Sequence, residues 1–118
     1  MGDFSYYGGG QYIVGYLAGK VRSVTREWGA SGAVSLPAAR YAARRLLPSD
    51  ARLQRRGSLS GDRLLEVYRS RSVERQFPRG GADPWLGGER GLMAVVYRLT
   101  GGRVSSMTVE VGGVSAER

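Results

Sequence analysis

Apolar side chains recur at a helical spacing in the first quarter of the chain. Between residues 12 and 28 they follow one another at intervals of four, four, three and four residues: Ile13, Leu17, Val21, Val24 and Trp28. This spacing places them on one stripe of a helix. Gly29 comes next, and glycine commonly ends helices. The pattern predicts a first helix over 12–28.

A second helix is predicted between Ser35 and Pro48. Ser35 is a residue type that caps helix N-termini, and Pro37 suits the first turn. The residue before Pro48 is pushed out of the helical region, so the helix ends there. Its apolar stripe consists of Leu36, Ala39, Ala43, Leu46 and Leu47. After Pro48, the pair Ser49-Asp50 predicts the cap of one further helical turn, which Gly57 closes.

The last third of the chain has the pattern of a β-hairpin. Two alternating runs, 92–99 and 104–111, flank the turn residues Gly101-Gly102. The predicted register pairs Leu99 with Val104, Val96 with Met107, Ala94 with Val109 and Leu92 with Val111. One face of this hairpin is then buried and carries Ala94, Val96, Met107, Val109 and Val111. Ser106, Thr108 and Glu110 point to water beside Tyr97.

Three other segments have weaker patterns. Residues 63–70 favour a strand, because Val67 and Tyr68 are typical of strands, although a helix capped by Asp62 remains an alternative. Residues 78–91 contain two glycine pairs and Pro84 and are predicted to form an unusually long loop, of a kind that tends to be functional or mobile. Residues 1–11 combine aromatic side chains with the run 8–10 of three glycines, which predicts a flexible arm. The arm either contacts a neighbouring subunit or is a frayed terminus.

Together these elements predict an α+β fold, in which two N-terminal helices pack on an antiparallel sheet that ends in a C-terminal β-hairpin. A length of 118 residues fits one domain, 12–118, after the arm 1–11. The 42% of hydrophobic residues argues against global disorder. Neither a targeting signal nor an apolar stretch of spanning length is found, so we expect a soluble protein of the virion or cytoplasm with no membrane partner.

The absence of two residue types excludes much chemistry. The chain has no cysteine and no histidine, which excludes thiol catalysis, disulfides, the usual zinc sites and acid–base catalysis by histidine. No Walker loop is present, and no spacing pairs two carboxylates for sugar chemistry. We therefore expect no cofactor, no metal and no catalytic residue, and a protein that is more readily a binder than an enzyme.

Positive charge is concentrated in the middle of the chain. Lysine and arginine number 18 against 10 acidic residues, and all but Lys20 are arginine. Residues 40–79 hold eleven arginines against four acids, a local charge of +7. This favours a surface for nucleic acid or an acidic partner, with a solvated face as the alternative. The candidate binding residues are Arg40, Arg44, Arg45, Arg52, Arg55 and Arg56, with Tyr41 or Tyr68 available to stack on a base.

The middle of the chain resembles a known class of assembly proteins. The stretch 42–53 (AARRLLPSDARL), followed by Ser58-Leu59 and later by Glu89-Arg90-Gly91, is similar to segments of tailed-bacteriophage head–tail connector and tail-component proteins. The resemblance implies a small structural virion protein that forms a homo-oligomer or larger assembly, with arms and loops that order on assembly and a basic helix facing DNA. The implied subunit contacts are Phe4, Tyr6, Tyr7 and Trp85.

A second resemblance implies an RNA-directed enzyme. The strand 93–99 (MAVVYRL) and its hairpin partner resemble the last strands of RelE-type ribonuclease toxins. Such enzymes can work without histidine, by stabilising charge with cations and an aromatic side chain. The residues that this resemblance implies are Arg69, Arg71, Tyr97 and Arg98. A free-standing, sequence-independent nucleic-acid binder is the third alternative.

Overall fold

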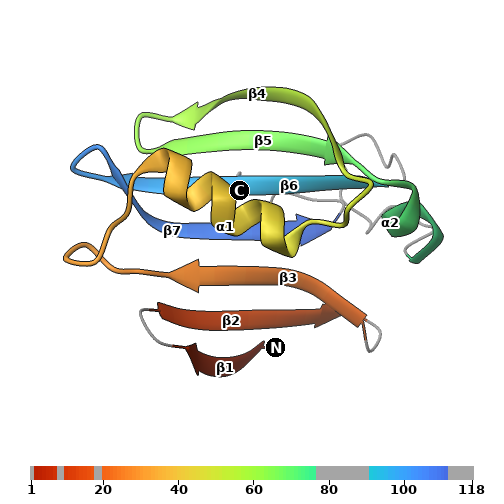
Figure 1. Cartoon of the computed structure of the whole chain (residues 1–118), viewed down its shortest axis with the longest axis horizontal. Coiled ribbons are helices and arrows are strands. Elements are labelled where there is room, and N and C mark those ends of the chain that lie inside the picture. Colours follow the sequence, from red (N-terminus) through yellow and green to blue (C-terminus); the bar gives the residue numbers. More distant parts are fainter. Residues whose placement is uncertain (1, 8–9, 18–19, 77–90, 112–118) are drawn as a thin grey trace.

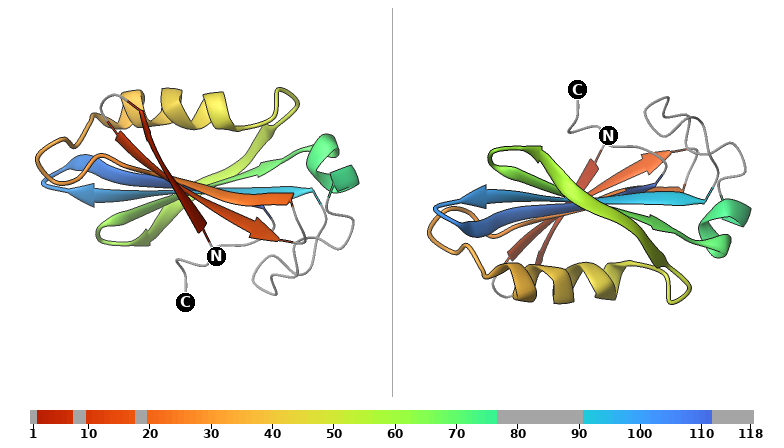
Figure 2. Two further views of the ribbon diagram at one scale, coloured as in Figure 1. Left: turned by 90° about the horizontal axis from the view of Figure 1, so that it is seen from below. Right: turned by 90° about the horizontal axis from the view of Figure 1, so that it is seen from above.

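In the computed structural model, a twisted antiparallel sheet of seven strands carries helix α1 on one face (Figures 1 and 2). The structure describes residues 2–7, 10–17, 20–76 and 91–111. The strands are β1 (Gly2–Tyr7), β2 (Gly10–Leu17), β3 (Lys20–Glu27), β4 (Arg52–Ser60), β5 (Arg63–Arg69), β6 (Leu92–Thr100) and β7 (Arg103–Val111); the helices are α1 (Leu36–Leu46) and α2 (Arg71–Gln76).

The strand order β1-β2-β3-β7-β6-β5-β4 follows from a single crossover. After β3 the chain passes through α1 to the opposite edge of the sheet, where β4 begins (Figure 1). It then returns as the meander β4-β5-β6-β7 until β7 pairs with β3. Helix α1 therefore lies across the meander, and the β1–β2–β3 half of the sheet lies to one side of it (Figure 1). No helix in the described ranges is long and apolar enough to cross a membrane.

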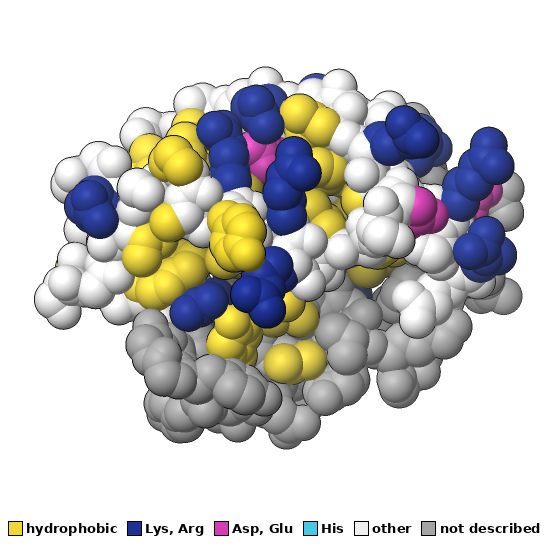
Figure 3. Space-filling model, in the orientation of Figure 1, with side chains coloured by type: hydrophobic (Ala, Val, Ile, Leu, Met, Phe, Trp, Pro, Cys, Tyr) yellow, Lys and Arg dark blue, Asp and Glu magenta, His cyan; other side chains and the backbone are white. Residues whose placement is uncertain are grey.

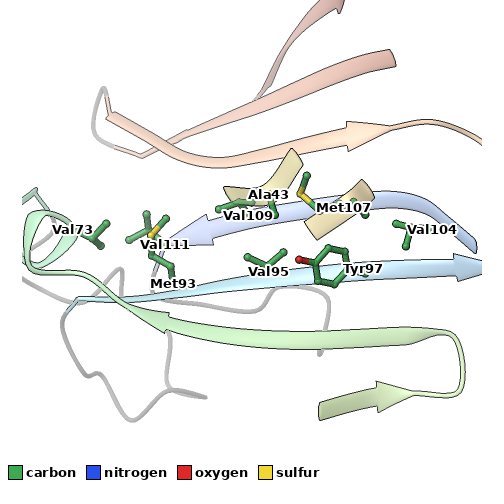
Figure 4. Close-up of a cluster of buried hydrophobic side chains, with 10 residues drawn as sticks. Ala43, Val73, Met93, Val95, Tyr97, Val104, Met107, Val109 and Val111 are labelled. Atoms are coloured by element: carbon green, nitrogen blue, oxygen red, sulfur yellow. The ribbon is translucent and has the colours of Figure 1, made fainter. Parts of the chain in front are cut away.

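The main core lies between α1 and the sheet. The helix contributes Ala39 and Ala43, both at most 1% exposed. Their small side chains let α1 approach the buried residues of β6 and β7 that Figure 4 shows, among them Val95, Tyr97 and Met107. A second buried cluster occupies the opposite face of the sheet and consists of Leu65, Val67, Leu92, Ala94 and Val96. Both faces of β6 are thus buried, as is typical of a central strand.

Helix α1 confirms the second predicted helix. The Ser35 hydroxyl accepts a hydrogen bond from the Ala38 amide at 3.3 Å, and Pro37 lies in the first turn. The helix ends at Leu46, with Leu47 already extended before Pro48. The sequence signals were local ones, namely an N-cap, a proline and a stripe of apolar residues, and they sufficed.

The predicted helix over 12–28 is wrong, and so is the fold class of two N-terminal helices on a sheet. Strands β2 and β3 occupy this segment and pair with each other. Intervals of four residues, such as Ile13 to Leu17, fit the two-residue period of a strand as well as a helix. Along β3, Arg22, Val24 and Arg26 lie on the face of α1, and Ser23 and Thr25 lie on the other face. The chain is consequently dominated by its sheet, with α1 as its one long described helix.

Other segments also differ from expectation or lie outside the described residues. The helical turn expected between Ser49 and Gly57 is wrong, because β4 begins at Arg52. Residues 63–70 are confirmed as a strand, β5. Within the segment 1–11, predicted to be a flexible arm, residues 2–7 form β1 and residues 10–11 begin β2, and the two strands pair with each other. The expected loop 78–91 lies outside the described residues except for Gly91.

The C-terminal hairpin is confirmed, but its register differs by one residue over most of its length. Gly101 and Gly102 form the turn with positive φ angles of 60° and 78°, and Leu99 pairs with Val104 as expected. A bulge between Arg98 and Leu99 then shifts the pairing, so that Tyr97 lies opposite Met107. Other partners change likewise: Val96 pairs with Thr108, Ala94 with Glu110 and Met93 with Val111.

The bulge changes which residues share a face. Ala94 and Val96 lie on the face opposite α1, whereas Met107, Val109 and Val111 face the helix. Tyr97, expected beside water, is fully buried, and Glu110 is buried as well.

We expect two glycine substitutions to have different effects on stability. Gly91 has a φ of 80°, and a Cβ there would lie 2.9 Å from the Ser70 carbonyl oxygen, so Gly91→Ala should cost about 2 kcal/mol. Gly57 has open space around it and no positive φ, so Gly57→Ala should be neutral or stabilise by about 0.5 kcal/mol. Urea unfolding followed by circular dichroism measures both values. An equal loss in the two variants would contradict the backbone geometry described for Gly91.

Candidate functional site

The six candidate arginines divide between the two faces of the sheet. Arg40, Arg44 and Arg45 lie on α1. On β4, Arg56 is paired with Glu66, whose carboxylate lies on the α1 side. Arg52 and Arg55 are paired with residues of the opposite face, Arg69 and Val67. The structure therefore brings four of the six together, and Figure 3 shows arginine side chains gathered on the face that carries α1.

Two of these four arginines are held by the protein itself. The Glu66 side chain is 1% exposed and accepts hydrogen bonds from Arg40 Nε at 2.8 Å and Arg56 Nε at 3.0 Å. The hydroxyls of Tyr68 and Tyr97 each donate to Glu66 Oε1 at 2.9 Å. Burial by itself raises the pKa of Glu66, but the hydrogen bonds from the two tyrosines and Arg40 outweigh it and hold this pKa below its usual range.

In this network the Tyr97 hydroxyl donates its hydrogen bond to Glu66, so Tyr97 is not available to an RNA-cleaving site. Burial and the nearby Glu66 carboxylate raise the pKa of the Tyr97 phenol, which lies on the α1 side of the sheet. Arg69 and Arg98 lie on the opposite face, where Arg69 is paired with Leu92 and Arg98 with Arg63. Arg71 begins α2. The structure does not bring together the four residues of the ribonuclease resemblance.

A groove lies between α1 and strands β2 and β3. Its volume is about 780 Å³. The helix contributes Ala38, Tyr41, Ala42, Arg45 and Leu46; the strands and the segments beside them contribute Tyr12, Val14, Arg26, Trp28 and Val34. The groove exists because α1 covers the meander and leaves this half of the sheet uncovered (Figure 1). None of the described residues that line it is acidic.

Aromatic rings and guanidinium groups are in contact within this groove. The Arg26 guanidinium lies 5.2 Å from the ring centre of Tyr12 and 5.0 Å from that of Trp28. On the helix, Arg45 lies 6.0 Å from the ring of Tyr41, which is 66% exposed. Such cation–π contacts hold both the ring and the charge in a defined orientation. The groove thus presents flat apolar surfaces and positive charge together.

Two buried polar atoms on β3 have no hydrogen-bond partner in the described part of the chain. Arg22 and Arg26 both lie on the α1 side of the strand, since Val24 between them pairs with Val109 of the main core. The Nε atoms of both arginines are buried and have no hydrogen-bond acceptor among the described residues. An unsatisfied buried donor costs about 1–3 kcal/mol. An acceptor supplied by a bound anion would recover this cost.

Sequence reasoning missed most of the groove. It placed Trp28 on the apolar stripe of a helix and gave no role to Tyr12 or Arg26. The available signal was the alternation at period two, Tyr12 with Val14 and Arg26 with Trp28, which puts each pair on one face of a strand. No group of three or more side chains suited to hold a metal ion occurs among the residues that the structure describes.

Comparison of the chain with protein families, with curated proteins and with solved structures finds no match. The resemblance to phage connector proteins therefore remains a prediction.

Proposed function

We propose that this protein is a non-enzymatic binding module that holds single-stranded nucleic acid in the groove between α1 and strands β2 and β3. One observation carries the proposal: three aromatic rings and two arginines line the same groove, and none of the described residues that line it is acidic. Proteins that bind single strands without sequence preference combine aromatic side chains, on which bases stack, with cations that follow the phosphates.

The position of the aromatic rings inside the groove favours a single strand over a duplex. Tyr12 and Trp28 lie at the sheet side of the groove, opposite the helix residues Tyr41 and Arg45. Bases in a duplex are stacked on one another and cannot reach such rings, whereas unstacked bases can. The exposed Arg44 and Arg45 then remain for phosphate contacts, because Arg40 and Arg56 are already paired with Glu66.

Assembly into a connector-type particle remains the other proposal. The side chains expected to make subunit contacts, Phe4, Tyr6, Tyr7 and Trp85, lie outside the described side chains, so the geometry does not bear on them. The edge strand β4 carries Arg52, Arg55 and Arg56. Like charges on an edge strand oppose its pairing with a second copy of itself, so any homo-oligomer is expected to use another surface.

Tryptophan fluorescence tests the nucleic-acid proposal. In a Trp85→Phe background, Trp28 is the one remaining tryptophan, and its emission should be quenched by an oligothymidylate that stacks beside it. Contacts from three or four arginines predict that log K falls with log[salt] at a slope of about −2 to −3, at about −0.7 per phosphate.

The competing partner is an acidic amphipathic peptide, which the same groove charge would attract. Titration of such a peptide in the same background is the matched measurement. Quenching by the peptide without quenching by oligothymidylate would overturn the proposal. So would an oligothymidylate affinity that does not change with salt.

A further inference from the structure

A second, polar pocket lies on the face of the sheet opposite α1. Its volume is about 290 Å³, near the lower limit for small-molecule sites. Its polar lining comes from four strands and includes Thr25, Glu27, Arg63, Arg98, Ser106 and Thr108. Val96, a member of the buried cluster on the face away from α1, also lines it.

The strand register arranges this lining in two parallel rows. Glu27 pairs with Ser106, Ser106 with Arg98, and Arg98 with Arg63, so that one row runs from an acid to two cations. The next row contains Thr25 and Thr108, whose hydroxyls are hydrogen-bonded at 2.9 Å. Adjacent strands are about 4.8 Å apart, so about 10 Å of sheet separates the Cα atoms of Glu27 and Arg98.

The two arginines in this row oppose each other directly. Like charges at directly paired positions destabilise an antiparallel sheet. Arg63 is oriented by a hydrogen bond from its Nε to Ser60 Oγ at 3.3 Å. The exposed Arg98 side chain forms no hydrogen bond or ion pair with a described residue, and neither does Glu27. Asp62 lies near both arginines but accepts its side-chain hydrogen bond from Ser60.

We propose that this pocket binds a small zwitterion, with its oxyanion group at Arg98 and Arg63 and its ammonium group at Glu27. Guanidinium groups recognise carboxylate and phosphate oxygens through paired hydrogen bonds. An anion between the two arginines would relieve their repulsion. Glu27 at the other end of the row would repel a second negative charge and attract an amine. The hydroxyls of Ser106 and Thr108 supply further hydrogen bonds along the row.

This site is independent of the proposed nucleic-acid groove, because the two lie on opposite faces of the sheet. The ligand class is defined by two opposite charges at a fixed separation. Glycine, 4-aminobutyrate and 6-aminohexanoate provide that pair of charges at increasing separation. Phosphoethanolamine carries a phosphate group in place of the carboxylate. Acetate and butylamine each carry only one of the two charges.

Titration of the full chain with these probes, followed by amide chemical shifts in nuclear magnetic resonance spectra, tests the proposal. At least one zwitterion should shift the amide signals of Thr25, Ser106 and Thr108 with a Kd of about 1 mM or lower. Acetate and butylamine should bind at least about tenfold more weakly, because each leaves one end of the row unpaired.

Two substitutions separate the roles of the charges. Arg98→Gln should weaken the binding of every probe that carries an oxyanion group about tenfold or more. Glu27→Gln should weaken the binding of the zwitterions to a similar extent and leave the binding of acetate unchanged or stronger. Arg75→Gln, on α2, is the matched control and should leave the binding of every probe unchanged. Absence of shifts with every zwitterion at about 10 mM would overturn the proposal, as would zwitterion binding that is insensitive to Glu27→Gln.

Discussion

Replacing Glu66 by glutamine is expected to lower the free energy of unfolding by about 3 kcal/mol, the largest stability change that we predict for a single polar group. The buried carboxylate accepts hydrogen bonds from two arginines and two tyrosines. An uncharged amide oxygen has a weaker attraction for these donors, and the amide nitrogen accepts none. The Arg56 side chain is 49% exposed, so its share is reduced by solvent screening. Urea unfolding at pH 7 measures the total.

Glu27→Gln is the matched control for this experiment. It makes the same chemical change on a partly exposed strand residue that forms no ion pair with a described residue, so its effect should stay within about 0.5 kcal/mol. Similar losses in the two variants would show that net charge, and not the four-donor network, determines the stability.

The same network predicts a pH dependence with a defined sign. The pKa of Glu66 is lower in the folded protein than in the unfolded chain, so its contribution is complete above the ordinary carboxyl pKa of about 4.3. It is lost as the pH falls through the folded pKa. The stability difference between the wild type and Glu66→Gln should therefore be constant near neutral pH and shrink in acid.

Asp50 behaves similarly in both proteins and cancels from this difference. Hydrogen bonds from the Ser70 hydroxyl and the Ser72 amide lower the pKa of Asp50 to about 2. A difference that grows as the pH is lowered would contradict the sign predicted for Glu66.

The elements that sequence reasoning recovered are those with local signals. Helix α1 has an N-cap at Ser35 and a proline at each end. The last hairpin has two glycines that adopt positive φ angles. Its register was not recoverable in the same way, because the bulge after Arg98 is a property of the paired strands and leaves no separate mark in the sequence.

The segments that failed depend on contacts distant in sequence. The spacing of apolar residues over 12–28 satisfies two periods, and the pairing of β3 with β7 decides for the strand. Strand β4 is an exposed edge without apolar alternation, and its pairing with β5 holds it in the sheet. Tertiary pairing overrode weak local preference in both cases.

The candidate site shows the same division. The charge excess of residues 40–79 is a property of the sequence, but its distribution over two faces is not. Arg55 and Arg56 are neighbours in the chain, and consecutive strand residues point to opposite faces. Only the assignment of β4 as a strand separates them. The groove itself is formed by β2, β3 and α1 together. Trp28 and Tyr41 line the same groove because these three elements pack against one another.

The division of the arginines between the two faces of the sheet leads to the binding prediction with the largest effect. The double substitution Arg44→Glu with Arg45→Glu should weaken oligothymidylate binding about 100-fold at about 0.1 M salt, since two cations beside the groove become two repulsive charges. Both side chains are exposed and belong to the surface of α1, so the fold should be retained. Titration of Trp28 fluorescence in the Trp85→Phe background gives the affinities.

The matched control is Arg52→Glu with Arg55→Glu, which changes the net charge by the same amount on exposed residues of the opposite face. Because exposed charges more than about 10 Å apart are largely screened at 0.1 M salt, this variant should lose less than about fivefold in affinity. Equal losses in the two variants would mean that overall charge attracts the nucleic acid and that the groove has no part in holding it. A loss confined to the α1 pair would locate the bound strand on the face where the aromatic rings lie.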